Sequence, residues 1–251
     1  MWKLDESYFY RLKRVAMNRL SAGGVVVYLM GLCEYSFVIL GTSTWVLWGN
    51  QGRVILGGIL TTIYFILVAM LLMLIIYLVV CIISEKFIFK SQKFAAVAMV
   101  VYTLVMSVEP LFLLYLFYLD RNGKGNHGFG NWVIATIIAG CIQFVMYFML
   151  VRNGVKVGSM KKDGIGMFRG SRNLKRAVTV TGLCFSSLIT WLFFIEGSAA
   201  IIEGCIIFLF LLFALIGAVQ EFIILTVCRY RFATFSITYK EATKHRERRK
   251  G

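Results

Sequence analysis

Four glutamate residues lie within long apolar stretches of this sequence: Glu34, Glu109, Glu203 and Glu221. A carboxylate in hydrocarbon is costly, so acids inside a membrane usually face protein or water and mark routes for ions or protons. No Lys or Arg lies deep in these stretches to pair with them. Each carboxyl is therefore expected to be protonated, to face water or to bind a cation. The acids predict either a polar path across the bilayer or four independent hydrogen bonds that hold helices together.

Two of these acids have informative neighbours. Glu203 and Glu221 are eighteen residues apart, which is five turns at about 3.6 residues per turn, so one helix face carries both. Glu109 precedes Pro110, the only proline of the chain. A proline removes one backbone hydrogen bond and kinks or breaks a helix. The pair predicts a cation or proton site beside freed carbonyls or, alternatively, a packing kink with a protonated acid.

Uncharged polar residues recur in two further apolar stretches. Gln143 is expected to form a hydrogen bond between helices. Thr179, Ser186 and Thr190 repeat, with Gly182, at intervals of three or four residues and form one stripe of a helix. Such a stripe predicts either close helix packing or a wetted wall.

The elements that must position these residues are membrane spans. Hydrophobic residues make up 59% of the chain, charged residues 16%, and the mean hydropathy is +0.79, which excludes a soluble globular domain. About 20 helical residues cross a bilayer. The sequence predicts an all-α membrane protein with one domain, residues 21–229, of six transmembrane helices. The expected spans are residues 22–48, 54–83, 94–118, 131–151, 177–195 and 199–228.

The first twenty residues form a basic leader. Tyr8, Leu12, Val15 and Leu20 recur at near-helical spacing among basic residues, which predicts a short amphipathic helix on an anionic membrane surface. The alternative is a solvated leader that only sets orientation. Residues 230–251 are predicted to be a basic cytoplasmic tail.

The basic residues also predict the orientation. Of the 27 Lys and Arg residues, 24 lie in residues 1–21, 84–93, 152–176 and 229–251. Since cytoplasmic segments carry the excess of Lys and Arg, both termini are expected in the cytoplasm. The net charge of +15 is explained by anionic lipid headgroups and not by nucleic acid. The candidate cytoplasmic docking residues are Lys161, Lys162, Arg169, Arg172, Arg246, Arg248 and Arg249.

Several kinds of chemistry are not expected. The chain has no GxxxxGK[ST] run, so any ATP must be bound by a partner. No His or Asp lies in any predicted span, and the six cysteines show no CxxC spacing. Intramembrane proteases need such groups, and zinc sites need such spacing. We therefore expect no enzyme, no metal and no cofactor.

Two functions are compatible with the sequence. The first is a transport or permease subunit, possibly the membrane half of an ATP-driven exporter, whose glutamates line a polar path and whose cytoplasmic face binds a separate ATPase. The alternative is a non-transporting partner of another membrane protein, such as an assembly factor, a sensor or an immunity-type protein. The outer loops have no N-x-[ST] glycosylation acceptor, which favours an integral plasma membrane protein of the bacterial cytoplasmic membrane.

Overall fold

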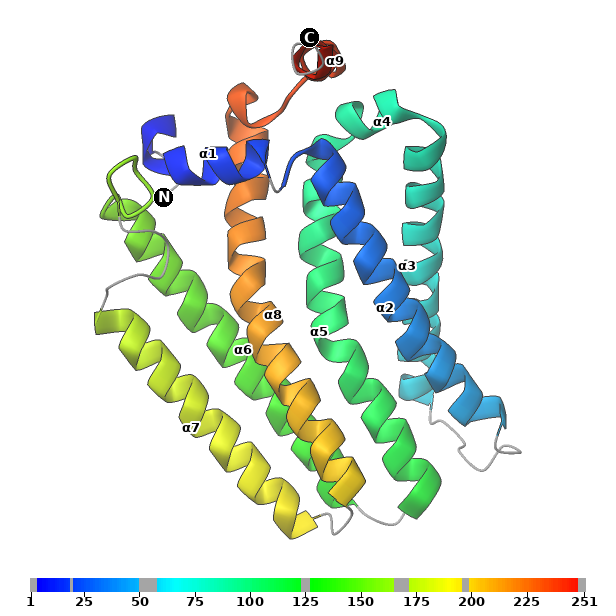
Figure 1. The fold of residues 1–251 in the computed structure, drawn as a ribbon. Helices are drawn as coiled ribbons and strands as arrows, with labels where there is room; N and C mark the ends of the chain where they lie inside the picture. The colour runs from blue at the N-terminus through cyan, green and yellow to red at the C-terminus, as the bar shows by residue number, and fades with distance from the viewer. Residues whose placement is uncertain are drawn as a thin grey trace.

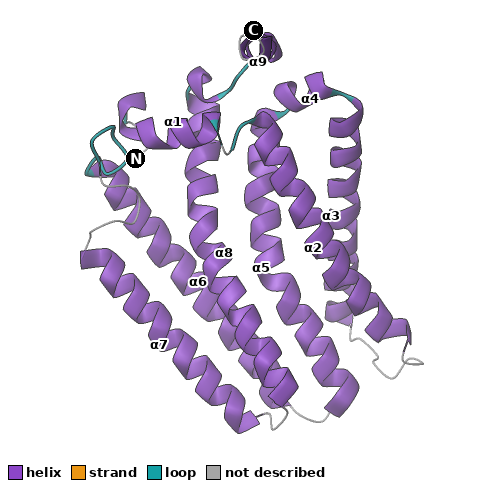
Figure 2. Ribbon diagram, viewed as in Figure 1, coloured by secondary structure: helices purple, strands orange, loops and turns teal. Residues whose placement is uncertain are grey.

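The computed structural model describes residues 4–18, 20–49, 58–122, 127–164, 172–195 and 199–247. Every regular element in these ranges is a helix (Figure 2), which confirms the all-α prediction. The elements are η1 (Glu6–Phe9), α1 (Tyr10–Met17), α2 (Ala22–Gly49), α3 (Gly58–Ile83), α4 (Glu85–Lys90), α5 (Gln92–Asn122), α6 (His127–Lys156), α7 (Arg172–Ile195), α8 (Ala199–Arg231), η3 (Ala233–Phe235) and α9 (Tyr239–Glu247).

Five of the described helices, α2, α3, α5, α6 and α8, are long and apolar enough to cross a membrane. They run side by side in a bundle (Figure 1). The chain is therefore a polytopic membrane protein. In α7 the apolar part is Val178–Phe193, which is shorter than the roughly 20 residues of a typical span. The sixth predicted span remains a prediction.

The helices extend beyond several predicted boundaries. The start of the second predicted span, residues 54–57, lies outside the described residues. The predicted loop 84–93 contains the short helix α4, and α6 continues past residue 151 to Lys156. The helices are longer because their last turns pass from the apolar region into polar surroundings, which hydropathy alone does not register.

Pro110 does not break its helix. It lies inside α5, which continues on both sides, and Figure 1 shows the two halves of α5 running in different directions. The missing N–H and the ring of proline cost one hydrogen bond and push the preceding turn aside. The buried residues after Pro110, Leu111 to Leu114, pack into the bundle and keep the second half helical.

The helix pair α5 and α8 lies at the centre of the bundle. These two helices have the most extensive contact, followed by α2 with α5, while α3 and α7 lie at opposite edges (Figure 1). One apolar core joins α1, α2, α3, α5, α8 and the end of α6. A second joins α5, α6, α7 and α8. Most polar side chains discussed below lie at these interfaces.

A layer of short elements covers one end of the bundle, the end at which both termini lie (Figure 1). We call it the cap; it consists of residues 4–18 and 20, α4, the turn 157–164 and residues 232–247. The leader contains η1 and α1, and its residues Phe9, Leu12 and Ala16 are buried in the first apolar core. The apolar side of this amphipathic helix therefore packs against the bundle itself.

Candidate functional site

The most enclosed carboxyl group is that of Glu109, at the interface of α2 and α5. Its side chain is only 3% exposed, and Ser36 Oγ donates a hydrogen bond to Glu109 Oε2 at 2.7 Å. The side chain of Tyr35 interacts electrostatically with Glu109, and its buried hydroxyl has no hydrogen-bond partner among the described residues. The sequence analysis identified Glu109 but missed Ser36 and Tyr35, because nothing along the chain shows which face of α2 meets α5.

Pro110 adds a further polar group to this site. A proline cannot donate to the carbonyl four residues earlier, which here belongs to Met106. A carboxyl, a serine hydroxyl, a phenol and a freed carbonyl therefore occur within the same region of two helices. Oxygen ligands of this kind can exchange a proton or hold a small hard cation.

The other three glutamates lie in different surroundings. Glu34 on α2 and Glu203 on α8 are exposed on the surface of the bundle, and Glu221 is half-buried. Protein encloses Glu109 alone among these four acids. The spacing of Glu203 and Glu221 puts both on one face of α8. Neighbouring helices cross α8 at an angle, so they cover Glu221 more than Glu203.

Gln143 lies between α6 and α8. Its Nε2 donates to the carbonyl of Phe213 at 3.2 Å, while its Oε1 is buried without a partner. The hydroxyl of Thr181 on α7 is also buried and unpaired. Both residues line one cavity of about 10 Å³, which is close to the least volume that holds a water molecule. Thr181 was not predicted, because the repeating hydroxyl residues of α7 indicated a different face of that helix.

The predicted hydroxyl stripe of α7 faces outward. Thr179, Ser186 and Thr190 are all exposed. Ser186 Oγ donates to the carbonyl of Leu183 at 3.1 Å, and Thr190 Oγ1 donates to that of Ser186 at 2.9 Å. The stripe therefore lies on an exposed side of α7.

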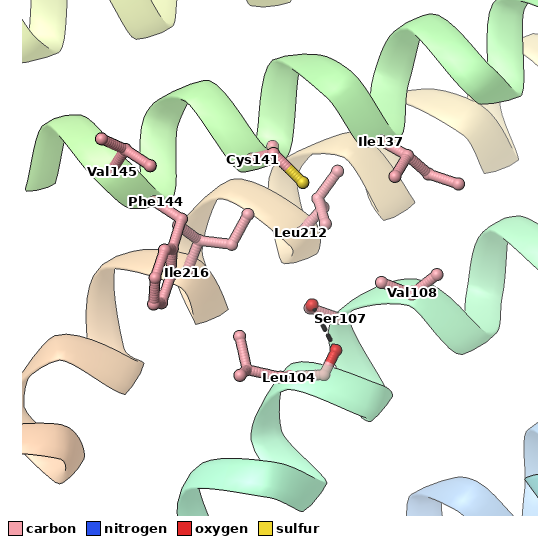
Figure 3. A pocket seen from close by; sticks show the side chains of 10 residues that line it. Leu104, Ser107, Val108, Ile137, Cys141, Phe144, Val145, Leu212 and Ile216 are labelled. Carbon is pink, nitrogen blue, oxygen red and sulfur yellow. Dashed lines mark hydrogen bonds between the residues drawn. The ribbon is translucent and has the colours of Figure 1, made fainter. Parts of the chain in front are cut away.

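An apolar groove of about 370 Å³ lies between α5, α6 and α8 (Figure 3). Leu212 and Ile216 of α8 form its floor, and residues of α5 and α6 form its walls. Ser107 lines it as well, but Ser107 Oγ donates to the carbonyl of Leu104 at 2.7 Å. The groove thus offers mainly hydrocarbon surface, together with the thiol of Cys141 on α6.

Trp132 joins α6 to α7. It is fully buried, and its Nε1 donates to the carbonyl of Leu188 at 2.9 Å. Phe129 stacks on it at 5.3 Å between ring centroids and on Tyr118 of α5 at 4.3 Å. This aromatic stack and Trp132 connect three helices.

Polar contacts in the cap tie the two ends of the chain together. Glu6 accepts hydrogen bonds from Lys13 Nζ and Thr234 Oγ1, both at 2.6 Å. These bonds, that of Lys13 first, hold the pKa of Glu6 below its ordinary value. Gln92 at the start of α5 binds the tail through both amide atoms, since its Nε2 donates to the carbonyl of Ile237 at 2.6 Å and its Oε1 accepts from the Ile237 N–H at 3.3 Å.

The predicted docking residues are placed only in part. Lys161 and Lys162 are exposed in the turn 157–164, and Lys161 Nζ lies 3.9 Å from the ring centroid of Tyr8. Three of the docking residues, Arg169, Arg248 and Arg249, lie outside the described residues. The side chains of Arg172 and Arg246 are not described. The short helix α4 also exposes Lys86 and Lys90, which were not on the list of predicted docking residues.

The structure also shows a buried cation that the sequence analysis missed. The last span was predicted to end at residue 228, with Arg229 in a basic cytoplasmic segment, but the Arg229 side chain is 1% exposed and α8 continues to Arg231. The available signal was its place directly after an apolar run that had not yet reached a helix-ending residue.

Within the described residues, no three His, Cys, Asp or Glu side chains gather as a potential metal site. Comparison with protein-family models, curated proteins and solved structures finds no match.

Proposed function

We propose that this protein is the membrane-spanning subunit of a transporter in the bacterial cytoplasmic membrane. In this proposal α7 is the sixth span and both termini are cytoplasmic. The position of the cap at one end of the bundle supports this orientation (Figure 1), because the cap holds most of the segments that carry the excess of Lys and Arg. The chain itself catalyses no reaction, and the energy comes from a separate ATPase.

The observation that carries the proposal is the link from the cap to the centre of the bundle. The short helix α4 connects α3 directly to α5 and exposes Glu85, Lys86 and Lys90. Gln92 at the start of α5 also holds the tail through Ile237. A soluble partner bound to α4 would thus act on α5, which packs against α2 and α8 and carries Glu109.

Glu109 is the proposed polar group of the transport path. It shares the interface of α2 and α5 with Ser36, so a relative movement of these helices would open or close the carboxyl to water. The region around Ser36, Tyr35 and Glu109 supplies oxygen atoms for a proton or a small cation.

The first test is to purify the full chain through a tag in mild detergent and to identify the proteins that accompany it. The proposal expects a stoichiometric soluble ATPase. Reversing the charges of α4 with Lys86→Glu and Lys90→Glu should remove the ATPase, whereas Lys240→Glu in α9 serves as the matched exposed control. Recovery of the chain without an ATPase, from cells that hold it at native level, would overturn the ATP-driven function.

A second candidate function is a non-transporting partner of another membrane protein. It is favoured by Glu34 and Glu203, whose exposed carboxyls on membrane-spanning helices would be costly against lipid and would be covered by the helix of a partner. Glu34→Gln and Glu203→Gln should then release a co-purifying membrane protein, while Glu109→Gln should not. Loss of transport in Glu109→Gln with normal folding would instead favour the transport path.

A further inference from the structure

The side chain of Arg229, near the cap end of α8, is a buried cation with unused donors. It is 1% exposed, and its Nη2 donates to the carbonyl of Leu20. Its Nε and Nη1 are buried and have no hydrogen-bond partner among the residues that the structure describes. A buried guanidinium without a counter-charge is strongly unfavourable, because it has left water and gained no anion in return.

Leu20, the residue that Arg229 binds, lies two positions before the first residue of α2. The first four N–H groups of a helix have no partner within the helix. In α2 the Gly24 N–H donates to Ser21 Oγ at 3.4 Å, and the Val25 N–H donates to the Ser21 carbonyl at 2.9 Å. The N–H groups of Ala22 and Gly23 belong to the same helix end. A Cβ placed on exposed Gly23 would meet no atom within 4 Å, so there is open space beside this helix end.

Arg229 and the N-terminus of α2 carry charge of the same sign. The N-terminus of a helix is equivalent to about half a positive charge, and Arg229 adds a full one. The carboxylate of Glu6 in η1 is already bound to Lys13 and Thr234. An anion that accepts hydrogen bonds from both Arg229 and the α2 N-terminus would relieve the repulsion and satisfy the free donors.

We propose that Arg229 and the N-terminus of α2 form a binding site for the phosphate group of a bilayer phospholipid. The site lies where two membrane-spanning helices meet the cap, which is the level of the lipid headgroups. The excess of basic residues in the cap segments attracts anionic lipid to this level. The phosphate binds between α2 and α8 beside the leader, so the lipid becomes part of the attachment of the cap to the bundle.

The test uses the full chain, purified in detergent and freed of lipid. Dioleoyl phosphatidylglycerol, dioleoylglycerol and inorganic phosphate are added separately, and bound lipid is measured by native mass spectrometry together with the thermal midpoint. Phosphatidylglycerol should bind and raise the midpoint, and dioleoylglycerol, which has the same chains without phosphate, should do neither. If inorganic phosphate alone raises the midpoint as much, the ligand is a soluble phosphate and the lipid assignment is overturned.

Two arginines of the same helix end provide a matched pair of variants. Arg229→Met should weaken binding of phosphatidylglycerol about tenfold or more, as expected for the loss of charged hydrogen bonds. Arg231→Met, which changes an exposed arginine two residues away, should stay within about twofold because exposed ion pairs contribute little. Equal binding by wild type and Arg229→Met would overturn the proposal.

A second variant tests the site without altering Arg229. Gly23→Asp places a carboxylate in the first turn of α2, where it can act as a built-in anion. It should raise the thermal midpoint of the lipid-free protein and abolish the response to phosphatidylglycerol. A response as large as that of the wild type would contradict the proposed position of the phosphate, even if Arg229→Met failed to fold.

Discussion

Among the described residues, side chains of α2 and α5 bond directly to each other although the Tyr35 hydroxyl is unpaired, whereas the side-chain bond from α6 to α7 runs from Trp132 to a backbone carbonyl. Between α2 and α5, Ser36 is paired with Glu109 and Tyr28 with Thr103, whose hydroxyl oxygens are 3.0 Å apart. Near the contact of α6 with α7, one oxygen of Gln143 and the hydroxyl of Thr181 are buried without a partner.

The difference shows how each part of the bundle is held. Direct hydrogen bonds between α2 and α5 define the rotation and register of both helices. At the other edge α7 is held by apolar packing and by the bond of Trp132 to Leu188. We expect the first interface to be the less tolerant of polar substitution and the second to depend on the shape of one large side chain.

The largest expected effect is that of Trp132→Ala. It removes a fully buried side chain and the bond to α7, which should lower the free energy of unfolding by about 3–5 kcal/mol. The measurement is denaturant unfolding in detergent. Trp45→Ala, at a side chain that is 61% exposed, should stay within about 0.5 kcal/mol. Equal effects of the two variants would mean that Trp132 does not hold α7.

Ser36→Ala should have the next largest effect, because it leaves the buried carboxyl of Glu109 without its donor. The expected cost is about 1–3 kcal/mol. Glu109→Gln retains an acceptor for Ser36 and should cost less than Ser36→Ala. The exposed Ser186→Ala on α7 is the control and should change the stability by under about 0.5 kcal/mol. A cost for Ser36→Ala as small as that of Ser186→Ala would contradict the pairing.

Gln143→Leu tests the opposite interface. The change loses one hydrogen bond to Phe213 but also removes a buried unpaired oxygen, so the net cost should be within about 1 kcal/mol. Adding Thr181→Val should leave the stability nearly unchanged, since both polar groups of the small cavity are then gone. If the double variant is less stable than Ser36→Ala, the two interfaces do not differ as described.

The smallest effect concerns the cap and depends on pH. Hydrogen bonds from Lys13 and Thr234 lower the pKa of Glu6 below its ordinary value of 4.5. The contribution of Glu6 to folding stability is therefore fully present above the pKa of the unfolded chain. It is lost as the pH falls through the lower pKa of the folded protein. The stability difference between wild type and Glu6→Gln should therefore be constant above about pH 4.5 and shrink below it. Thermal midpoints across this range measure it.

Much of the fold could be predicted because it depends on local properties. Stretches of apolar residues long enough to cross a bilayer become helices in any surroundings that lack water, since their backbone groups must bond internally. The helical leader followed from the spacing of Leu12 and its neighbours. The helix α4 was not foreseen, because six residues within a basic loop carry too little periodicity to distinguish a helix from a turn.

The candidate site could be predicted only in part. Glu109 was evident because an acid beside a proline in an apolar run is unusual. Its partners Ser36 and Tyr35 were not, since the polar residues of α2 are not gathered on one face and its pattern does not indicate which side faces protein. Thr181 was not predicted because the repeat of Thr179, Ser186 and Thr190 indicated a different face of α7, and that face is exposed.

The sequence by itself determined that the chain is a helical membrane protein with basic residues concentrated in a few segments, because helix formation and hydropathy are summed along the chain. Only the tertiary structure decided which glutamate is enclosed, and that Arg229 is buried beside Leu20 although 209 positions separate them. Such contacts depend on how each helix is rotated and crossed against its neighbours. Those angles are set by side-chain packing between helices, which no single stretch of sequence contains.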